Sequence, residues 1–362
     1  MSRPQVTLAV AAVLFAALTL LLGLAGGLST PLLLFGIAGL LTALRFFVPV
    51  SPWIDGALAA FGAWALLDAL ALFDVEPGWF WLALVACWLF AWLFVERLAR
   101  SIRHGGTPDV FGLLIPVVFG LSLLFAWEIV TRGANVPQVL LPAPSQIWER
   151  LVASVPTLAA DFIQTFKAVL AGFVLGCGSG FVVAILVDRS PFLKRGLLPI
   201  GNFVSALPII GIAPIMVMWF GFDWPSKAAV VVAMTFFPML VNTVAGLNAS
   251  SSIERDLMRT YASSYWETLY KLRLPAAAPF IFNALKINST LALIGAIVAE
   301  FFGTPIVGMG FRISTEVGKL NIDLVWAEIA VAAVAGSAFY GVIALIERAV
   351  TFWHPSIRGG RT

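Results

Sequence analysis

Long apolar stretches recur along almost the whole chain, and they constrain its fold more than any other feature. They cover roughly residues 6–28, 31–50, 54–73, 79–95, 110–131, 162–187, 199–220, 226–247, 280–302 and 324–346. Each is close to the ~20 residues that a helix needs to cross the hydrocarbon core of a bilayer. Of the 362 residues, 60% are hydrophobic and only 11% are charged. The sequence therefore predicts an all-α, polytopic membrane protein with about ten transmembrane helices.

The distribution of Lys and Arg orients these helices. An even number of spans places both termini on one side, and the positive-inside rule assigns to the cytoplasm the side with more basic residues. With the N-terminus in the cytoplasm, 16 of the 22 Lys and Arg fall in cytoplasmic segments. We therefore expect both termini in the cytoplasm. The basic residues lie at the ends of apolar runs and form no single stripe, so we expect no nucleic-acid partner.

One polar stretch, residues 96–109, interrupts the series of spans. It contains three arginines, a glycine pair and a proline, which together are typical of a connecting segment. The stretch separates four spans from six. We therefore predict a four-helix membrane extension over residues 1–105 and a second domain over residues 106–362.

Motifs for nucleotide binding and catalysis are missing from the sequence. There is no GxxxxGK[ST] motif, and no GxSxG or HExxH signature occurs. Neither histidine has Cys, Asp and Glu around it at metal-ligand spacing. We therefore expect a chain that is not itself an enzyme and holds no metal or cofactor.

Small residues repeat every four positions within the stretch 162–187. Gly176, Gly178 and Gly180 in the same stretch superficially resemble a nucleotide-binding loop. Such a stripe allows two membrane helices to approach closely, so we expect a packing role. The stripe consists of Ala168, Gly172, Gly176, Gly180 and Ala184.

Charged residues within the apolar stretches are candidates for function, because they are costly inside a membrane. A charged residue near the outer end of a span has two possible roles. Its side chain can extend to the membrane interface, or it can form a structural ion pair. The candidates are Asp68, Glu128, Lys167, Lys286 and Glu300.

The longest cytoplasmic segment, residues 250–276, has enough polar sequence to form a docking element. We predict a first helix capped by Ser252 and a second helix over residues 265–272 that ends before Pro275. Clustered aromatic residues mark protein interfaces, so a partner protein is expected to bind here. The aromatic residues are Tyr261, Tyr265, Trp266 and Tyr270.

This segment resembles the EAA signature of ABC importer membrane subunits, E-A-A-x3-G-x9-I-x-L-P, by which the permease engages a separate ATPase. The matching positions are Asp256, Leu257, Met258, Ala262, Leu272, Leu274 and Pro275. Ala262 stands where the family has glycine, the residue suited to a turn with positive φ, and Asp256 replaces a glutamate. The surrounding RT-x-A-S-S-x-W, LPAAAPFIFNALKI and IVAE are similar to the nitrate, sulfonate and taurine branch. Further matches in the family's order include Trp127-Glu128, Ala206-Leu207-Pro208 and Gly308-Met309-Gly310.

The resemblance implies a type I ABC importer permease with a six-helix core and a coupling loop at about 250–276. Implied partners are cytoplasmic ATPase subunits that hold ATP and magnesium, an extracytoplasmic solute-binding protein and a second copy of the chain in a bacterial-type inner membrane. The substrate would be a small solute such as nitrate, a sulfonate, taurine or a pyrimidine-type vitamin precursor. The residues expected to couple to the ATPase are Asp256, Arg259, Thr260, Ala262, Ser263, Ser264, Trp266, Leu272, Leu274 and Pro275.

The translocation path is expected along the seventh to ninth spans, where prolines break helix regularity and neutral polar groups offer hydrogen bonds. Each asparagine could instead join neighbouring helices. The residues expected on the path are Pro208, Pro214, Asn242, Asn283, Asn288, Ser289 and Glu300.

Two other classes of protein remain open. An ion-coupled secondary transporter would need midplane carboxylates and repeated halves, and an intramembrane enzyme would need a catalytic group of residues within the spans.

Overall fold

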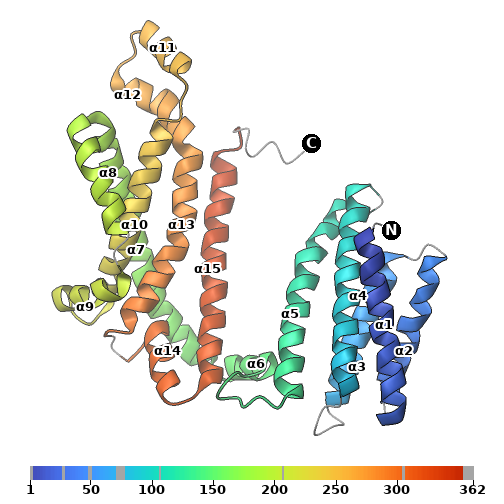
Figure 1. Ribbon diagram of the computed structural model, residues 1–362. Coiled ribbons are helices and arrows are strands. Elements are labelled where there is room, and N and C mark those ends of the chain that lie inside the picture. Colours follow the sequence, from blue (N-terminus) through green and yellow to red (C-terminus); the bar gives the residue numbers. More distant parts are fainter. Residues whose placement is uncertain are drawn as a thin grey trace. The chain divides into compact units, whose positions relative to one another are not determined.

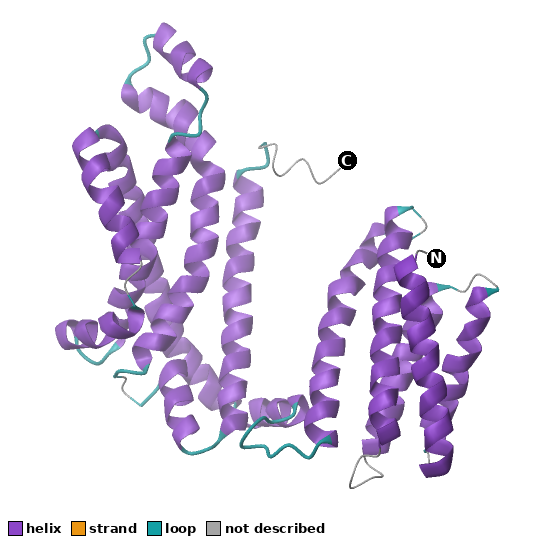
Figure 2. Cartoon of the chain, viewed as in Figure 1, coloured by secondary structure: helices purple, strands orange, loops and turns teal. Residues whose placement is uncertain are grey.

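The computed structural model (Figure 1) describes residues 3–26, 29–47, 51–70, 78–105, 107–205, 208–303 and 306–353. Within these ranges every regular element is a helix (Figure 2), and eight helices are long and apolar enough to cross a membrane. The predicted all-α, polytopic fold is therefore confirmed. The chain divides into two compact units, Met1–Trp148 and Glu149–Thr362. The predicted boundary at residue 105 stays a prediction.

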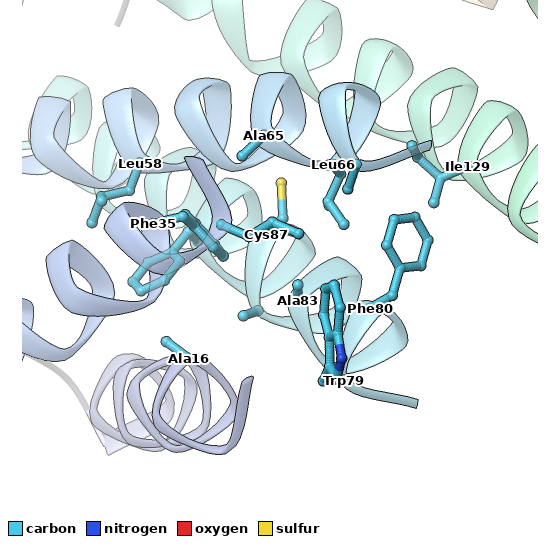
Figure 3. Packing of buried hydrophobic residues seen from close by; sticks show 14 of the residues in the cluster. Ala16, Phe35, Leu58, Ala65, Leu66, Trp79, Phe80, Ala83, Cys87 and Ile129 are labelled. Carbon is cyan, nitrogen blue, oxygen red and sulfur yellow. The ribbon is translucent and has the colours of Figure 1, made fainter. Parts of the chain in front are cut away.

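The N-terminal unit is a helical bundle in which α4 packs against α1, α3 and α5. Its core is rich in aromatic and small side chains, and Figure 3 shows Phe35, Phe80 and Trp79 among them. Cys87 is buried in this cluster as a free thiol, as expected for a small apolar residue. The helices are α1 (Arg3–Gly26), α2 (Thr30–Leu41), α3 (Pro52–Leu70), α4 (Gly78–Arg103), α5 (Leu114–Gly133) and α6 (Pro144–Ala153), which extends past the end of the unit.

The C-terminal unit is built around α10, which packs most extensively against α7 and α13. Two short helices, α11 and α12, follow α10 and precede α13 (Figure 1). The helices are α7 (Val155–Arg189), α8 (Pro191–Ser205), α9 (Ile209–Phe220), α10 (Trp224–Leu247), α11 (Ser252–Thr260), α12 (Tyr265–Thr268), α13 (Leu274–Glu300), α14 (Met309–Gly318) and α15 (Ile322–Val350).

The small-residue stripe lies on the face of α7 that packs against α10, and all five of its members are buried. A Cβ atom added at Gly180 would lie 2.6 Å from the carbonyl oxygen of Phe236, which is too close for any side chain. The packing role predicted for the stripe is therefore confirmed, and its glycines form no nucleotide-binding loop.

Two predicted spans are shorter than a full crossing. The stretch 199–220 holds the end of α8 and then α9, whose 12 residues would extend only ~18 Å. Pro208 caps α9 with an extended backbone, so the helix cannot run continuously through it. The stretch 31–50 holds the 12 residues of α2 and then a 3₁₀ segment, Thr42–Phe46. There the Thr42 hydroxyl donates to the Gly39 carbonyl oxygen at 2.6 Å, competing with the regular helical bonds.

Several charges predicted within or near the spans have partners. Glu128 accepts hydrogen bonds from the backbone N–H and the hydroxyl of Ser145, and forms an ion pair with Arg132 at 3.2 Å. Lys286 pairs with Glu347 at 2.7 Å. Of the two roles left open for Glu128, the structure shows the ion pair, which lies within α5. The hydrogen bonds from Ser145 join the end of α5 to the start of α6.

Candidate functional site

The coupling loop, residues 250–276, begins with a capping box at the start of α11. The Ser251 hydroxyl accepts from the Glu254 backbone N–H, and the Glu254 carboxylate accepts from the Ser251 backbone N–H at 2.8 Å. The prediction that Ser252 is the cap was wrong by one residue. The reciprocal bonds need a glutamate three residues after the serine, and only Ser251 has Glu254 at that spacing.

The end of α11 is a left-handed turn centred on Ala262, whose φ is 51°. The Ser263 N–H donates to the Met258 carbonyl oxygen at 3.0 Å, and the Ala262 N–H donates to the Arg259 carbonyl oxygen at 2.9 Å. This is the Schellman pattern that usually has glycine at the left-handed position. The turn expected for the family's glycine is therefore present, and an alanine adopts it at a cost of ~1–2 kcal/mol.

Changing Ala262 tests this strain directly. Ala262→Gly is expected to stabilise the turn by up to ~1 kcal/mol, because glycine adopts positive φ without a Cβ clash. Ala262→Val is expected to destabilise it by a further ~1–2 kcal/mol, because a branched side chain disfavours this conformation. Amide hydrogen exchange across residues 252–268 measures the local free energy. Ala249→Val is the matched control, since Ala249 is exposed and outside the left-handed region, and an equal effect of both valine variants would contradict the assignment.

A second capping box starts α12 immediately after the turn. The Glu267 carboxylate accepts from the Ser264 backbone N–H at 2.8 Å, and the Ser264 hydroxyl accepts from the Glu267 N–H. A π-helical segment, Leu269–Arg273, then joins α12 to α13 without a break. The predicted helix end before Pro275 was wrong. Pro275 lies in the first turn of α13, where proline is tolerated because its φ already suits the helix.

The base of the coupling loop is held by an ion pair between Arg273 and Asp188, the latter near the end of α7. Two guanidinium nitrogens of Arg273 lie 2.7 and 2.6 Å from the two oxygens of Asp188, and both side chains are largely buried. Arg273 Nε also donates to the Leu247 carbonyl oxygen at the end of α10, and the Tyr265 hydroxyl donates to Asp188 at 3.0 Å. The loop is therefore bonded to α7 and α10 at the point where it continues into α13. The sequence does not indicate this pair, because nothing local to either residue points to a partner 85 positions away.

The coupling loop also exposes apolar side chains to the surroundings. Trp266 is 48% exposed and Tyr261 is 74% exposed. Tyr265 differs from the expectation of an exposed aromatic, because it is only partly exposed and its hydroxyl binds Asp188. The Arg189 guanidinium lies 5.8 Å from the Trp266 ring centre, in cation–π range. The exposed apolar residues are Ile253, Leu257, Tyr261, Trp266 and Tyr270.

The remaining residues predicted to couple to an ATPase separate into two groups. Asp256 and Arg259 form an exposed ion pair at 3.1 Å, and the Thr260 hydroxyl donates to the Asp256 carbonyl oxygen. All three residues lie in α11 and are exposed. Leu272, Leu274 and Pro275 are partly buried at the base of the loop. Their role in coupling stays a prediction.

The residues predicted for the translocation path do not share one environment. Asn288 is fully buried and donates to the Thr235 carbonyl oxygen at 2.8 Å and to Cys177 Sγ at 3.2 Å, which joins α13 to α10 and α7. Asn242 donates to the Pro238 carbonyl oxygen within α10. Ser289 is buried, Pro214 is half-buried within α9, and Asn283 and Pro208 are exposed. Asn288 thus joins neighbouring helices, which was the alternative considered for each asparagine. The translocation path itself stays a prediction.

Glu300, at the end of α13, binds the start of α14. The Gly310 backbone N–H and the Thr165 hydroxyl both donate to its carboxylate, at 2.7 and 2.9 Å. The Met309 N–H in turn donates to the Thr165 hydroxyl oxygen at 2.9 Å. A carboxylate at a helix N-terminus is favoured by the unpaired N–H groups and the helix dipole.

Asp161 completes this cluster on α7. It accepts from the Gly308 backbone N–H at 2.7 Å and forms an ion pair with Arg312 at 2.8 Å. The hydrogen bond to Asp161 raises the pKa of Arg312, so the guanidinium stays charged. Three successive backbone N–H groups, from 308 to 310, are thus bound by side chains of α7 and α13.

The sequence of this chain matches a family of known proteins. Residues 168–352 match the family described as binding-protein-dependent transport system inner membrane component. The formylaminopyrimidine transport permease protein of Halalkalibacterium halodurans is 30% identical, over 66% of this chain and 96% of the relative. The riboflavin transport system permease protein of Chloroflexus aurantiacus is 29% identical, over 72% and 98%. The taurine transport system permease protein of Escherichia coli is 25% identical, over 65% and 88%.

These matches support an ATP-driven importer and not the ion-coupled secondary transporter considered as an alternative. They also agree with the multi-pass membrane fold. The chain belongs to the family of inner-membrane components of binding-protein-dependent transport systems, the permease subunits of ABC importers.

Proposed function

We propose that two copies of this chain form the translocation pathway of the importer, with both termini of each copy in the cytoplasm. A separate ATPase, which holds ATP and magnesium, binds the coupling loop, and a solute-binding protein delivers the substrate on the opposite side. The observation that carries the proposal is the coupling loop itself, whose exposed surface includes apolar and aromatic side chains while its base is fixed by a buried ion pair.

The bonding of the loop suits it to transmit movement. The Schellman turn and the two capping boxes fix the angle between α11 and α12. The Arg273 to Asp188 pair then joins the loop to α7, and the bond to Leu247 joins it to α10. A displacement of the loop by the ATPase would therefore shift the ends of these helices together and favour one of two pore conformations.

A charge placed at the exposed turn tests the docking site. Ala262→Glu is expected to weaken ATPase binding at least ~10-fold, because a carboxylate buried in the interface without a partner is costly. The dissociation constant of the purified permease for its ATPase, and co-purification of the two chains, measure the effect.

Ala249→Glu is the matched control for this experiment. It adds the same charge at an exposed position immediately before the coupling loop, outside α11 and α12, and is expected to leave binding within ~2-fold. Unchanged ATPase binding by Ala262→Glu in folded, membrane-inserted protein would count against the docking site.

We propose a small solute as the substrate, of the nitrate, sulfonate or taurine type or a pyrimidine-type vitamin precursor. The names of the relatives support this range, since they include formylaminopyrimidine and taurine. Thermal-shift screening of these solutes against the cognate solute-binding protein would identify the class. A binding protein stabilised by none of them would contradict the proposal.

A further inference from the structure

A polar pocket lies at one end of the N-terminal unit, outside the residues that match the family. It has a volume of about 400 Å³ and opens to the surroundings. Three helices line it from their ends, namely the start of α1, the start of α3 and the last turns of α4. The lining residues are Gln5, Pro52, Arg97, Arg100, Ser101 and His104.

The pocket lies at the depth of lipid headgroups. The 26 residues of α4 extend ~39 Å, whereas the hydrocarbon core is only ~30 Å thick. The charged last turns of α4, from Glu96 onward, therefore lie beyond the hydrocarbon. Figure 1 shows the start of α1 and the end of α4 at the same end of the unit. Gln5 and Pro52 likewise lie at the first residues of apolar spans, so all three walls meet at one membrane interface.

Two arginines are held in place in the pocket wall. Arg97 forms an ion pair with Asp55, whose side chain is fully buried behind it, and the Arg97 side chain is only 14% exposed. Arg100 Nη1 donates to the Gln5 side-chain oxygen at 3.0 Å, and Arg100 Nη2 lies 3.6 Å from Glu96 Oε1. Both guanidinium groups are thus positioned by contacts that already exist in this structure.

We infer that this pocket binds a phosphate group, either that of an anionic lipid headgroup or free phosphate. Guanidinium groups present a planar fork of N–H donors that matches phosphate oxygens. Basic pockets between membrane helices at the interface are typical sites for anionic headgroups. Ser101 and His104 add polar groups to the same wall. The site is independent of the coupling loop and of the proposed importer function.

Binding of soluble probes to the full-length protein in neutral detergent tests the inference. The probes are dihexanoyl phosphatidylglycerol, sodium phosphate and dihexanoylglycerol, which has the same acyl chains without phosphate. Arg100→Gln is expected to weaken phosphatidylglycerol binding about fivefold, the loss of roughly one basic contact. Arg100→Lys keeps the positive charge but loses the planar set of guanidinium N–H donors. It is expected to weaken phosphatidylglycerol binding less than Arg100→Gln does.

Arg103→Gln is the matched control, because Arg103 is an exposed arginine of the same helix outside the pocket lining. It is expected to change binding less than ~2-fold. Binding of phosphatidylglycerol but not phosphate would identify a lipid headgroup as the occupant, and binding of phosphate but not phosphatidylglycerol would identify free phosphate. Equal weakening by Arg100→Gln and Arg103→Gln would overturn the site, as would binding of dihexanoylglycerol as tight as that of phosphatidylglycerol, or binding of neither phosphate-bearing probe.

Discussion

Asp188→Ala is expected to lower the free energy of unfolding by about 3–5 kcal/mol, because it leaves the largely buried guanidinium of Arg273 without its partner. The substitution also removes the acceptor of the Tyr265 hydroxyl, so it releases the base of the coupling loop from α7. Equilibrium unfolding of the detergent-solubilised protein measures the loss of stability. ATPase stimulation in the assembled complex measures the loss of coupling.

An exposed ion pair of the same loop provides the control. Arg259 and Asp256 are paired at 3.1 Å with side chains 83% and 67% exposed, and Arg259→Ala is expected to cost less than ~1 kcal/mol. The double variant Asp188→Leu with Arg273→Leu removes both buried charges and is expected to recover much of the stability without the specific bonds to Leu247 and Tyr265. Equal destabilisation by Asp188→Ala and Arg259→Ala would contradict the anchoring role.

Gly172→Ala is expected to destabilise the C-terminal unit by about 1–3 kcal/mol through overpacking between α7 and α10. A Cβ atom at this position would overlap the Val231 side chain and lie 2.7 Å from the Ala228 carbonyl oxygen. A backbone carbonyl cannot rotate away, so the two helices would have to separate. Equilibrium unfolding in detergent, with helix content followed by circular dichroism, measures the effect.

Gly178 offers a matched control on the same helix. A Cβ atom there would meet nothing within 4 Å, so Gly178→Ala is expected to be neutral or stabilising by up to ~1 kcal/mol. If Gly172→Ala were tolerated as well as Gly178→Ala, the close approach of α7 and α10 would not be required for stability.

The sequence predicted those parts of the fold that depend on local composition and period. Spans are recognisable because each needs ~20 apolar residues, and the small-residue stripe is recognisable because its period matches one helix face. The docking segment was predicted from its aromatic residues and its match to a family motif. The left-handed turn at Ala262 was predictable only because the family has glycine at this position. An alanine by itself does not indicate a left-handed turn.

Pairings between distant residues could not be predicted in the same way. Nothing near Asp188 indicates Arg273, and nothing near Glu300 indicates that its carboxylate binds Thr165 and the start of α14. Such contacts depend on which helix ends meet in three dimensions. The division of the stretch 199–220 into two helices was also not predicted, because its apolar composition is that of a full span although Pro208 interrupts it.

The bonds at the two ends of α7 have a joint consequence for how the two sides of the membrane communicate. Near its start, Asp161 and Thr165 bind the first residues of α14, and near its end, Asp188 binds the coupling loop. Both points lie on one uninterrupted helix of 35 residues, and Asp161 and Asp188 are ~40 Å apart along it. A single helix thus links the coupling loop near one end of α7 to the start of α14 near the other, so in the proposed mechanism a displacement of the loop would act on α14 through one continuous element.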